Sequence, residues 1–442
     1  MGRTLTSESP THECATQHAG LDEPLVFRKV IRRLVPLLFI AYLFCHLDRL
    51  NIGFAQLQMK SDLRFSDTVY GLGAGLFFVT YMACEVPSGL MLQRVGIRVT
   101  LLRIMVGWGI VSAATALVRT PTQFYVARLL LGACEAGFFP GIVYYISTWL
   151  PAAYRGRVIG VFLSGTVLAG VVGGPLSGFL LHNMNGTAGM AGWQWLFLIE
   201  GLPSVLLGVI AFFYLDDRPA DAKWLSQAER SLIEEAVVAD QAGRLRAHEG
   251  MRDVVRDPKV YLLAFIFFLT TMSVYGLNFW APQLIRSFGV DNLLHVGLYA
   301  AIPSAAAFVS MIALTRHSDA RMERRWHYAL PAFVGAISLA ITTIPGTSLA
   351  IALTALTVAY AGLFGVIPVF WSVPPAHLGA KAAAGGIAFI NTLAVFSGLV
   401  APYMLGLVRE STGSLAGGLL GLAGCSLVAG IAMLVGVKRT LV

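Results

Sequence analysis

The stretch FCHLDRLNIGF, from Phe44 to Phe54, places a histidine, an aspartate and an arginine within four residues of an otherwise apolar helical run. A charged side chain near the middle of a bilayer costs at least about 2.5 kcal/mol, so it needs a polar cavity or a partner of opposite charge. The stretch therefore predicts a transmembrane helix with one face turned toward a polar interior.

Composition extends this prediction to the whole chain. Of its 442 residues, 56% are hydrophobic and 13% are charged, whereas an ordinary soluble domain carries about 25% charged residues. Apolar runs of about 17 to 25 residues, the length that crosses a bilayer, can be placed twelve times along the chain. The sequence thus predicts an all-α membrane protein with twelve transmembrane helices.

A charged segment divides these helices into two sets of six. Asp216 to Lys259 holds 18 charged residues among 44, which predicts a solvated connector. Within it, Ser226 and Glu229 have the spacing of a capping box that begins a short amphipathic helix. The basic turns GLMLQRVGIRV and TRHSDARMERRW follow the second helix of each set, so we expect two pseudo-symmetric halves that rock around a central site. The predicted domains are a cytoplasmic N-terminal tail over 1–27, a six-helix half over 28–215, the connector over 216–259 and a second six-helix half over 260–442.

The distribution of basic residues predicts the orientation. With both termini in the cytoplasm, the cytoplasmic segments hold 25 of the 32 Lys and Arg residues, as the positive-inside rule requires. Topology therefore explains the formal charge of +8 without a nucleic-acid partner. The N-terminal stretch has no apolar core after a basic start, so we expect no cleaved signal peptide.

Four ionisable residues are predicted deep in the first half: Asp48 and Arg49 in the first helix, Arg128 and Glu135 in the fourth. The two arginines keep their charge and carry planar donor groups that suit a carboxylate, so we predict that they bind the anionic group of a substrate. Asp48 and Glu135 are the predicted proton carriers, because an anion at the arginines weakens the attraction that keeps a carboxylate ionised. Proton and anion then favour each other's binding.

The alternative role for these residues is structural. Asp48 with Arg128, or Arg49 with Glu135, are then static ion pairs that fix the packing of helices. Two roles are also open for His46. It either titrates near neutral pH or lines the cavity as a neutral side chain.

Other classes of protein and site have little support. The five cysteines have no paired spacing, which predicts neither a disulfide framework nor a metal site. The sequence contains no HExxH, P-loop, GxSxG or CxxC motif, so an enzyme has no chemical basis here. A non-transporting membrane sensor is disfavoured because the sequence shows no soluble signalling domain or long tail.

Seven motifs occur along the chain in an order that resembles a known family. They are LDRLNIGFA, EVPSGLMLQRVGIRV, RLLLGACEAGFFPGI, WQWLFLIEG, GLNFWAPQLI, RHSDARMERRWH and AAAGGIAFIN. Together, from Arg28 to Arg439, they resemble the anion:cation symporter family of the major facilitator superfamily. Within that family, the resemblance is to bacterial tartrate-type, aromatic-acid and sugar-acid permeases.

The resemblance implies the major facilitator fold and a secondary active transporter that works by alternating access. It implies import of a small organic carboxylate, such as a tartrate-like dicarboxylate, a sugar acid or an aromatic acid, by proton symport. It further implies protons as the coupling ion, no cofactor, and a monomeric multi-pass protein of the bacterial inner membrane. A proton-coupled exporter or an anion exchanger of the same fold is the alternative, because GVVGGPLSGF is similar to the glycine-proline motif of antiporters.

The functional positions of the family map onto this chain residue by residue. The resemblance implies proton-coupling roles for Asp48 and Glu135 and carboxylate binding by Arg49 and Arg128. The further substrate-contact positions that it implies are Tyr81, Trp371, Ser372 and Asn391. His46 stands where many relatives have an aromatic residue, so we expect it to contact the substrate or to alter the pH response.

Overall fold

The computed structural model describes residues 22–245 and 256–437. Most of the predicted N-terminal tail, 1–21, and one part of the connector, 246–255, lie outside the described residues. Within the described residues every regular element is helical. The α-helices are α2 (Glu23–Leu63), α3 (Asp67–Thr115), α4 (Pro121–Glu135), α5 (Phe138–Trp149), α6 (Ala152–Asn183), α7 (Gly192–Tyr214), α8 (Gln227–Leu245), α10 (Pro258–Ser287), α11 (Leu293–Arg321), α12 (Arg325–Ile341), α13 (Leu349–Trp371), α14 (Val373–Val395), α15 (Ser397–Thr412) and α16 (Ala416–Gly436), and the 3-10 helices are η1 (Thr187–Gly189) and η2 (Pro219–Asp221).

These helices provide twelve membrane crossings. Ten segments of the described residues are long and apolar enough to cross a membrane. One of them, α3, contains two crossings, because its 49 residues turn back at Gly96, whose φ of 80° is open to glycine but strained for other residues. Arg103 Nη2 donates a hydrogen bond to Ser88 Oγ at 2.7 Å, although 15 residues of a straight helix span about 22 Å. Helix α12, with 17 residues, completes the twelve, so the predicted fold class is confirmed.

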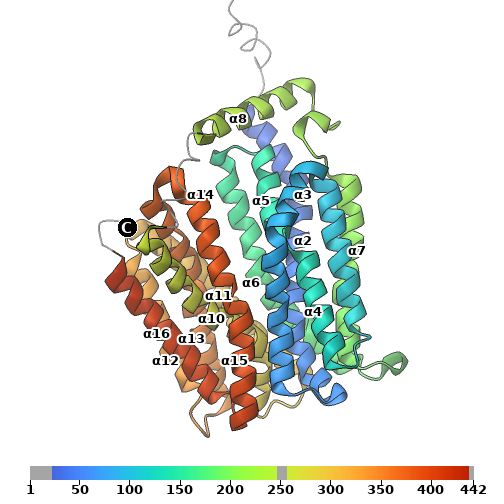
Figure 1. The fold of residues 1–442 in the computed structure, drawn as a ribbon, viewed down its shortest axis with the longest axis vertical. Helices are drawn as coiled ribbons and strands as arrows, with labels where there is room; N and C mark the ends of the chain where they lie inside the picture. The colour runs from blue at the N-terminus through green and yellow to red at the C-terminus, as the bar shows by residue number, and fades with distance from the viewer. Residues whose placement is uncertain (1–21, 246–255, 438–442) are drawn as a thin grey trace, which may run out of the picture.

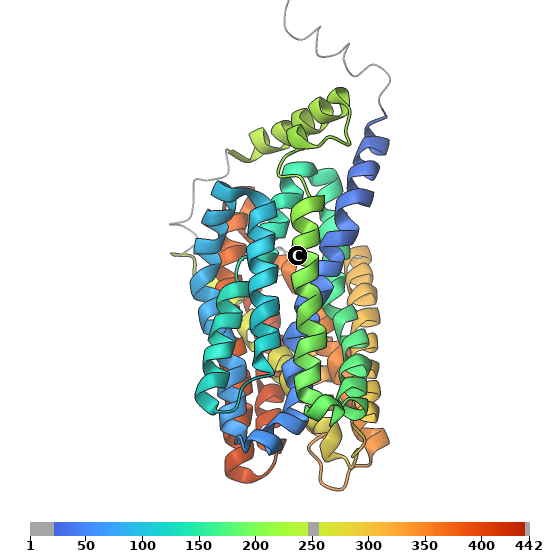
Figure 2. The same cartoon turned by 90° about the vertical axis from the view of Figure 1, so that its right-hand side faces the viewer.

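The crossings form two bundles that lie side by side. Figure 1 shows α2 to α7, coloured from blue to green, on one side and α10 to α16, from yellow to red, on the other. Helix α8 lies across one end of the molecule, which we call the connector end, and Figure 2 shows α2 reaching past its neighbours toward it. The capping box of α8 is confirmed, since Glu229 N donates to Ser226 Oγ at 3.2 Å and Ser226 N donates to Glu229 Oε2 at 2.7 Å. The residue limits of the four domains stay a prediction.

Small residues bring the two halves together along α6 and α11. A side chain on Gly297 of α11 would meet the carbonyl group of Gly174 in α6, and a side chain on Gly174 would meet the carbonyl oxygen of Gly297. Small residues of this kind let helix backbones approach closely. This contact has no interlocking side chains at its closest point, which suits the predicted rocking of the halves.

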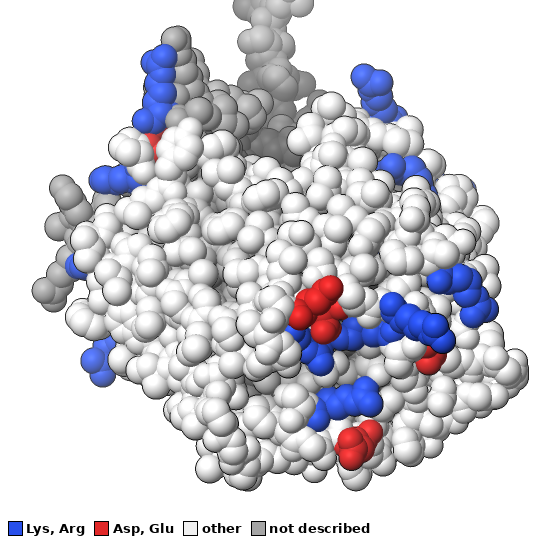
Figure 3. All heavy atoms as spheres, turned by 60° about the horizontal axis from the view of Figure 1, so that its bottom comes forward, with Lys and Arg blue, Asp and Glu red and all other residues white. Residues whose placement is uncertain are grey.

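At the end opposite the connector, charged side chains join the halves. The carboxylate of Asp67, at the start of α3, pairs with Lys60 of the same half and accepts a hydrogen bond at 3.1 Å from Arg409 of α15. Lys60 and Arg409 both lie over the ring of Trp280 in α10, at 5.6 and 5.7 Å from its centre. We call these four residues the Asp67 network. Figure 3, which views this end, shows acidic and basic side chains gathered on it.

Backbone acceptors reinforce the contact at the same end. Tyr70 OH donates a hydrogen bond to the carbonyl oxygen of Phe279 at 3.0 Å. Arg286 Nη1, from the second half, donates to the carbonyl oxygen of Leu57 in the first half at 2.7 Å. These bonds and the Asp67 network hold the two halves together at the end opposite the connector.

Candidate functional site

Arg49 of α2 and Glu135 of α4 form an ion pair within the first half. Glu135 Oε1 accepts a hydrogen bond from Arg49 Nε and a second one from Cys45 Sγ at 3.0 Å. The Glu135 side chain is 1% exposed, whereas the Arg49 side chain is 22% exposed. Arg49 is therefore the more accessible partner of this ion pair.

Glu135 lies at a break between α4 and α5. The chain leaves the helical conformation at Ala136, with ψ of 133°, and then passes through Gly137, whose φ is 86°. A side chain on Gly137 would be strained in this conformation and would also meet Ser88. The break leaves Glu135 as the last residue of α4, inside the membrane span from Pro121 to Trp149.

Asp48 precedes Arg49 by one residue but contacts a different neighbour. Its Oδ1 accepts hydrogen bonds from Ser112 of α3 and, at 3.0 Å, from Asn51 Nδ2. Its Oδ2 has no hydrogen-bond partner among the described residues and is free to take a proton. Among the described residues, Asp48 forms no ion pair with Arg128. Of the two static ion pairs considered from the sequence, only the pair of Arg49 with Glu135 is observed.

Arg128 is the fully buried cation of the group, with 2% of its surface exposed. Its Nη2 lies 3.5 Å from the carbonyl oxygen of Ala74, and its Nε and Nη1 have no hydrogen-bond partner among the described residues. A buried charge without a partner is strongly unfavourable. The ring of Phe77 offsets part of this cost, because its centre lies 5.1 Å from the Arg128 guanidinium and 5.4 Å from that of Arg49. An anion bound at the two arginines would supply the missing partner.

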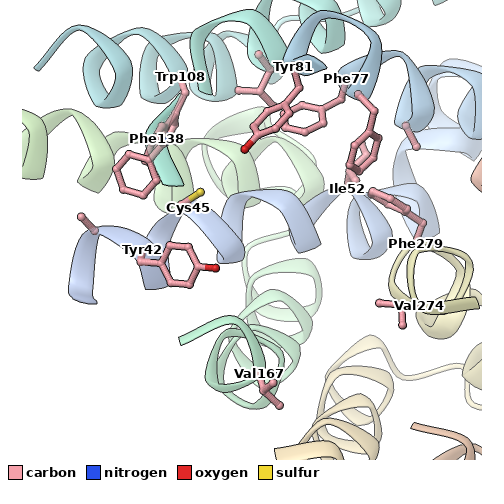
Figure 4. Packing of buried hydrophobic residues seen from close by; sticks show 14 of the residues in the cluster. Tyr42, Cys45, Ile52, Phe77, Tyr81, Trp108, Phe138, Val167, Val274 and Phe279 are labelled. Carbon is pink, nitrogen blue, oxygen red and sulfur yellow. The ribbon is translucent and has the colours of Figure 1, made fainter. Parts of the chain in front are cut away.

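The structure brings Tyr81 to this group. The Arg49 guanidinium lies 4.9 Å from the centre of the Tyr81 ring, and that ring stacks on Phe77 with centres 5.6 Å apart. Figure 4 shows the two rings next to each other on α3, directed toward the part of α2 that carries Cys45. The Tyr81 ring therefore forms part of the aromatic surface that the Arg49 guanidinium contacts.

His46 lies on another side of α2, against α6. Its Nδ1 is 3.2 Å from the carbonyl oxygen of Tyr42, and its Nε2 is 3.2 Å from Thr166 Oγ1. Thr166 also donates a hydrogen bond to the Tyr42 hydroxyl at 3.1 Å. In Figure 4, Tyr42 projects from α2 away from Tyr81 and toward the helix that carries Val167. His46, Tyr42 and Thr166 thus form a second polar group beside the ion pair.

The predicted residues of the second half lie apart from both groups. The ring of Trp371, the last residue of α13, packs 4.7 Å from that of Phe267. Ser372 follows at the start of α14, where its hydroxyl donates to the carbonyl oxygen of Val369 at 2.7 Å. Asn391 lies within α14 and is half-buried. No hydrogen bond or ion pair between described residues links these three to the first half.

Sequence reasoning did not select three supporting residues: Cys45, Ser112 and Phe77. Cys45 precedes Arg49 by four residues, a spacing that puts both on one helix face, so the sequence carried a signal for it. Ser112 is separated from Asp48 by 64 residues, and only the folded chain brings the two together. Phe77 looked like any other apolar residue of a transmembrane helix.

Comparisons with known proteins identify one family model, several related transporters and solved structures of similar fold. A family model described as Major Facilitator Superfamily matches residues 38–402. A protein of Agrobacterium vitis named "Putative tartrate transporter" is 45% identical over 413 residues, which cover 93% of this chain and 95% of that protein. A quinolone resistance transporter of Acinetobacter baumannii is 38% identical over 395 residues, covering 89% and 91%. Among solved structures, a D-xylose-proton symporter matches with a TM-score of 0.74 over 93% of this chain and 98% of that one, and at 14% identity this likeness concerns the fold alone.

Proposed function

This chain belongs to the Major Facilitator Superfamily, and from that membership we propose that it imports a small organic carboxylate together with protons by alternating access. Since its relatives are transporters, it is a secondary transporter of a small molecule and not an enzyme. Within that framework, the choice of substrate and the coupling to protons follow from the charges of the site.

The ion pair of Arg49 and Glu135 carries the proposal. An ionised Glu135 occupies the carboxylate-binding group of Arg49, which is the partly exposed cation of the site. A proton on Glu135 removes that negative charge, so the guanidinium becomes available to a carboxylate of the substrate. One proton and one carboxylate then enter together without changing the net charge of the site. Each makes the other's binding more favourable, as reciprocal linkage requires.

Arg128 favours a substrate with a second anionic or polar group. Its guanidinium has donors without a partner among the described residues, and it shares the Phe77 ring with Arg49. A dicarboxylate or hydroxycarboxylate can bridge the two cations, which agrees with the name of the Agrobacterium vitis relative. Asp48, one oxygen of which has no partner in the described part of the chain, is the second proposed proton carrier.

The second half completes the proposed site by moving. Because the halves are joined at the end opposite the connector, we infer that the substrate reaches Arg49 from the connector end. Rotation of the second half toward the first would then bring its polar and aromatic side chains onto the substrate. Those proposed contacts are Trp371, Ser372 and Asn391, with His46 from the first half.

The proposal also covers the membrane, the orientation, the oligomeric state and the coupling ion of the protein. We place it in a bacterial inner membrane with both termini in the cytoplasm, because the two relatives described above, at 45% and 38% identity, are bacterial and its basic residues are distributed accordingly. A monomer is sufficient for alternating access. Protons serve as the coupling ion, and neither a cofactor nor a nucleic acid is required.

Purified protein in liposomes that contain a pH-sensitive dye tests the proposal. Tartrate, an aldonate sugar acid and an aromatic carboxylate are added outside in turn, and acidification of the lumen by one of them indicates proton symport. Glu135→Gln is expected to abolish the acidification. Glu200→Gln, which changes a buried carboxylate bound to Ser177 at 2.9 Å, is the matched control and keeps it. Acidification that persists in Glu135→Gln would refute the coupling role.

Export is a second candidate, favoured by the 38% identity to a quinolone resistance transporter. A proton antiporter moves protons against its cargo, so uptake of that cargo into the same liposomes makes the lumen alkaline. Alkalinisation with an added quinolone, together with no response to the three carboxylates, would support export in place of import.

A further inference from the structure

A basic cavity lies at the connector end of the first half, far along α2 from the ion pair. Its volume is about 460 Å³, enough for a small charged group. Helix α2 supplies one wall, α7 ends at a second wall, and the chain after η2 supplies a third. The lining residues are Leu25, Arg28, Lys29, Arg32, Arg33, Tyr214 and Trp224.

Among the described residues, three of the four cations in this cavity have no anionic partner. Lys29 is neutralised by Glu229, whose two carboxylate oxygens each lie 2.9 Å from Nζ. Among the described residues, Arg28, Arg32 and Arg33 form no ion pair with a carboxylate. Arg33 Nε is buried without a hydrogen-bond partner. Within the described part of the chain, the lining of the cavity therefore has an excess of positive charge that suits an anion.

The aromatic wall of the cavity is held in place before any ligand binds. Trp224 stacks on Trp149, with ring centres 5.8 Å apart and planes at 12°, and its Nε1 donates to Asp216 Oδ2 at 2.8 Å. Arg33 lies over the rings of Trp224 and Tyr214, at 4.8 and 4.7 Å from their centres. These contacts fix the direction of the guanidinium, which lowers the entropy cost of binding a ligand there.

Apolar surface leads away from the cavity along both helices. On α7, Phe213, Ile210 and Leu206 share one face and are 76%, 40% and 62% exposed. On α2, Pro36 and Ile40 follow Arg32 at intervals of four residues and are also exposed. A ligand that fits both the cavity and the apolar faces of α2 and α7 has a compact anionic group for the cavity and hydrocarbon chains for these faces. Basic pockets at the ends of membrane helices are suited to anionic lipid headgroups in this way.

We propose that this cavity binds the headgroup of an anionic phospholipid, whose phosphate contacts Arg28, Arg32 and Arg33 and whose acyl chains lie along α2 and α7. The lipid then connects the first helix of the transporter to the connector, because Trp224 and Glu229 both belong to the connector and both contact residues of α2. A soluble phosphate shares the headgroup chemistry but not the hydrocarbon chains, so the two sources can be distinguished.

Native mass spectrometry of the purified full chain with added phosphatidylglycerol measures this binding. Phosphatidylcholine with the same acyl chains is the neutral reference, and inorganic phosphate in excess is the soluble competitor. The variant Arg32→Gln with Arg33→Gln is expected to bind phosphatidylglycerol about thirtyfold more weakly, since each basic residue near a membrane surface contributes roughly a fivefold factor. Arg316→Gln with Arg321→Gln, an equal change of charge at exposed positions of α11, is the matched control and keeps the affinity of the unmodified chain.

Three results would overturn the proposal. Unchanged phosphatidylglycerol affinity in the Arg32 and Arg33 variant would show that the lipid binds elsewhere. Equal binding of phosphatidylcholine would show that only the acyl chains are recognised. Complete displacement by inorganic phosphate would identify a site for a soluble anion. Should the double variant fail to fold in a thermal unfolding assay, Arg32→Gln alone, at an exposed position, keeps the test valid with an expected loss of about fivefold.

Discussion

Asp67→Asn tests whether the Asp67 network holds the two halves of the transporter together. The substitution keeps the size of the side chain and one acceptor oxygen, but it removes the charge that pairs with Lys60 and Arg409. Of these two pairs, only that with Arg409 crosses from one half to the other. The variant should therefore weaken the joined state and leave each half intact.

The size of the effect follows from the exposure of the three side chains. Asp67, Lys60 and Arg409 are between 14% and 22% exposed, so water screens the pair only in part. An ion pair of this kind contributes about 1 kcal/mol, and the loss of Asp67 also leaves two like charges over Trp280. We expect the population of the joined state, relative to the separated state, to fall about fivefold.

Distances between spin labels measure these populations. Labels at Ser61→Cys in α2 and Ser411→Cys in α15, in a background without other cysteines, report the separation of the two halves by double electron–electron resonance. Asp62→Asn is the matched control, because Asp62 accepts its bond from Trp193 Nε1, at 2.8 Å, within the first half. An unchanged distance distribution in Asp67→Asn, or an equal change in Asp62→Asn, would refute the reasoning.

Three further predictions concern the site, the packing of the halves and the connector. Glu135→Gln should reduce proton-driven accumulation about tenfold or more while counterflow exchange without a gradient persists, because it removes the titrating group from the coupling; loss of both activities would contradict this role. Gly297→Val should lower the free energy of unfolding, measured by thermal unfolding, by about 1–3 kcal/mol, because the new side chain meets the backbone of α6. Gly160→Ala should leave the free energy of unfolding unchanged, because its new side chain meets nothing within 4 Å. Burial alone would raise the pKa of Glu229, but hydrogen bonds, above all from Lys29, outweigh it and lower the pKa. The contact of α8 with α2 should therefore be stable above the ordinary glutamate pKa of about 4.3 and weaken as the pH falls through the lowered value. Hydrogen exchange in α8 measures this change, and an identical pH profile in Glu229→Gln would argue against it.

The positions of the helices could be predicted because a bilayer leaves few alternatives. Each crossing needs about 20 apolar residues that satisfy their own backbone hydrogen bonds, and hydropathy along the chain shows where these are. The capping box of Ser226 and Glu229 was equally predictable, since both partners lie within four residues. The contacts of Trp371 and Ser372 were not, because their neighbours depend on how α13 and α10 pack against each other.

The sequence by itself determined that Asp48, Arg49, Arg128 and Glu135 lie in the interior of the protein, because a charge has no stable position against lipid. Only the tertiary structure decided their partners. Adjacent residues of a helix point about 100° apart, so Arg49 meets Glu135 while Asp48 meets Ser112. Among the described residues Arg128 forms no ion pair, because the packing of distant segments directs the carboxylates of Asp48 and Glu135 to other partners. Which helix stands opposite each face is a property of the folded chain, and the charge pattern of a single helix does not contain it.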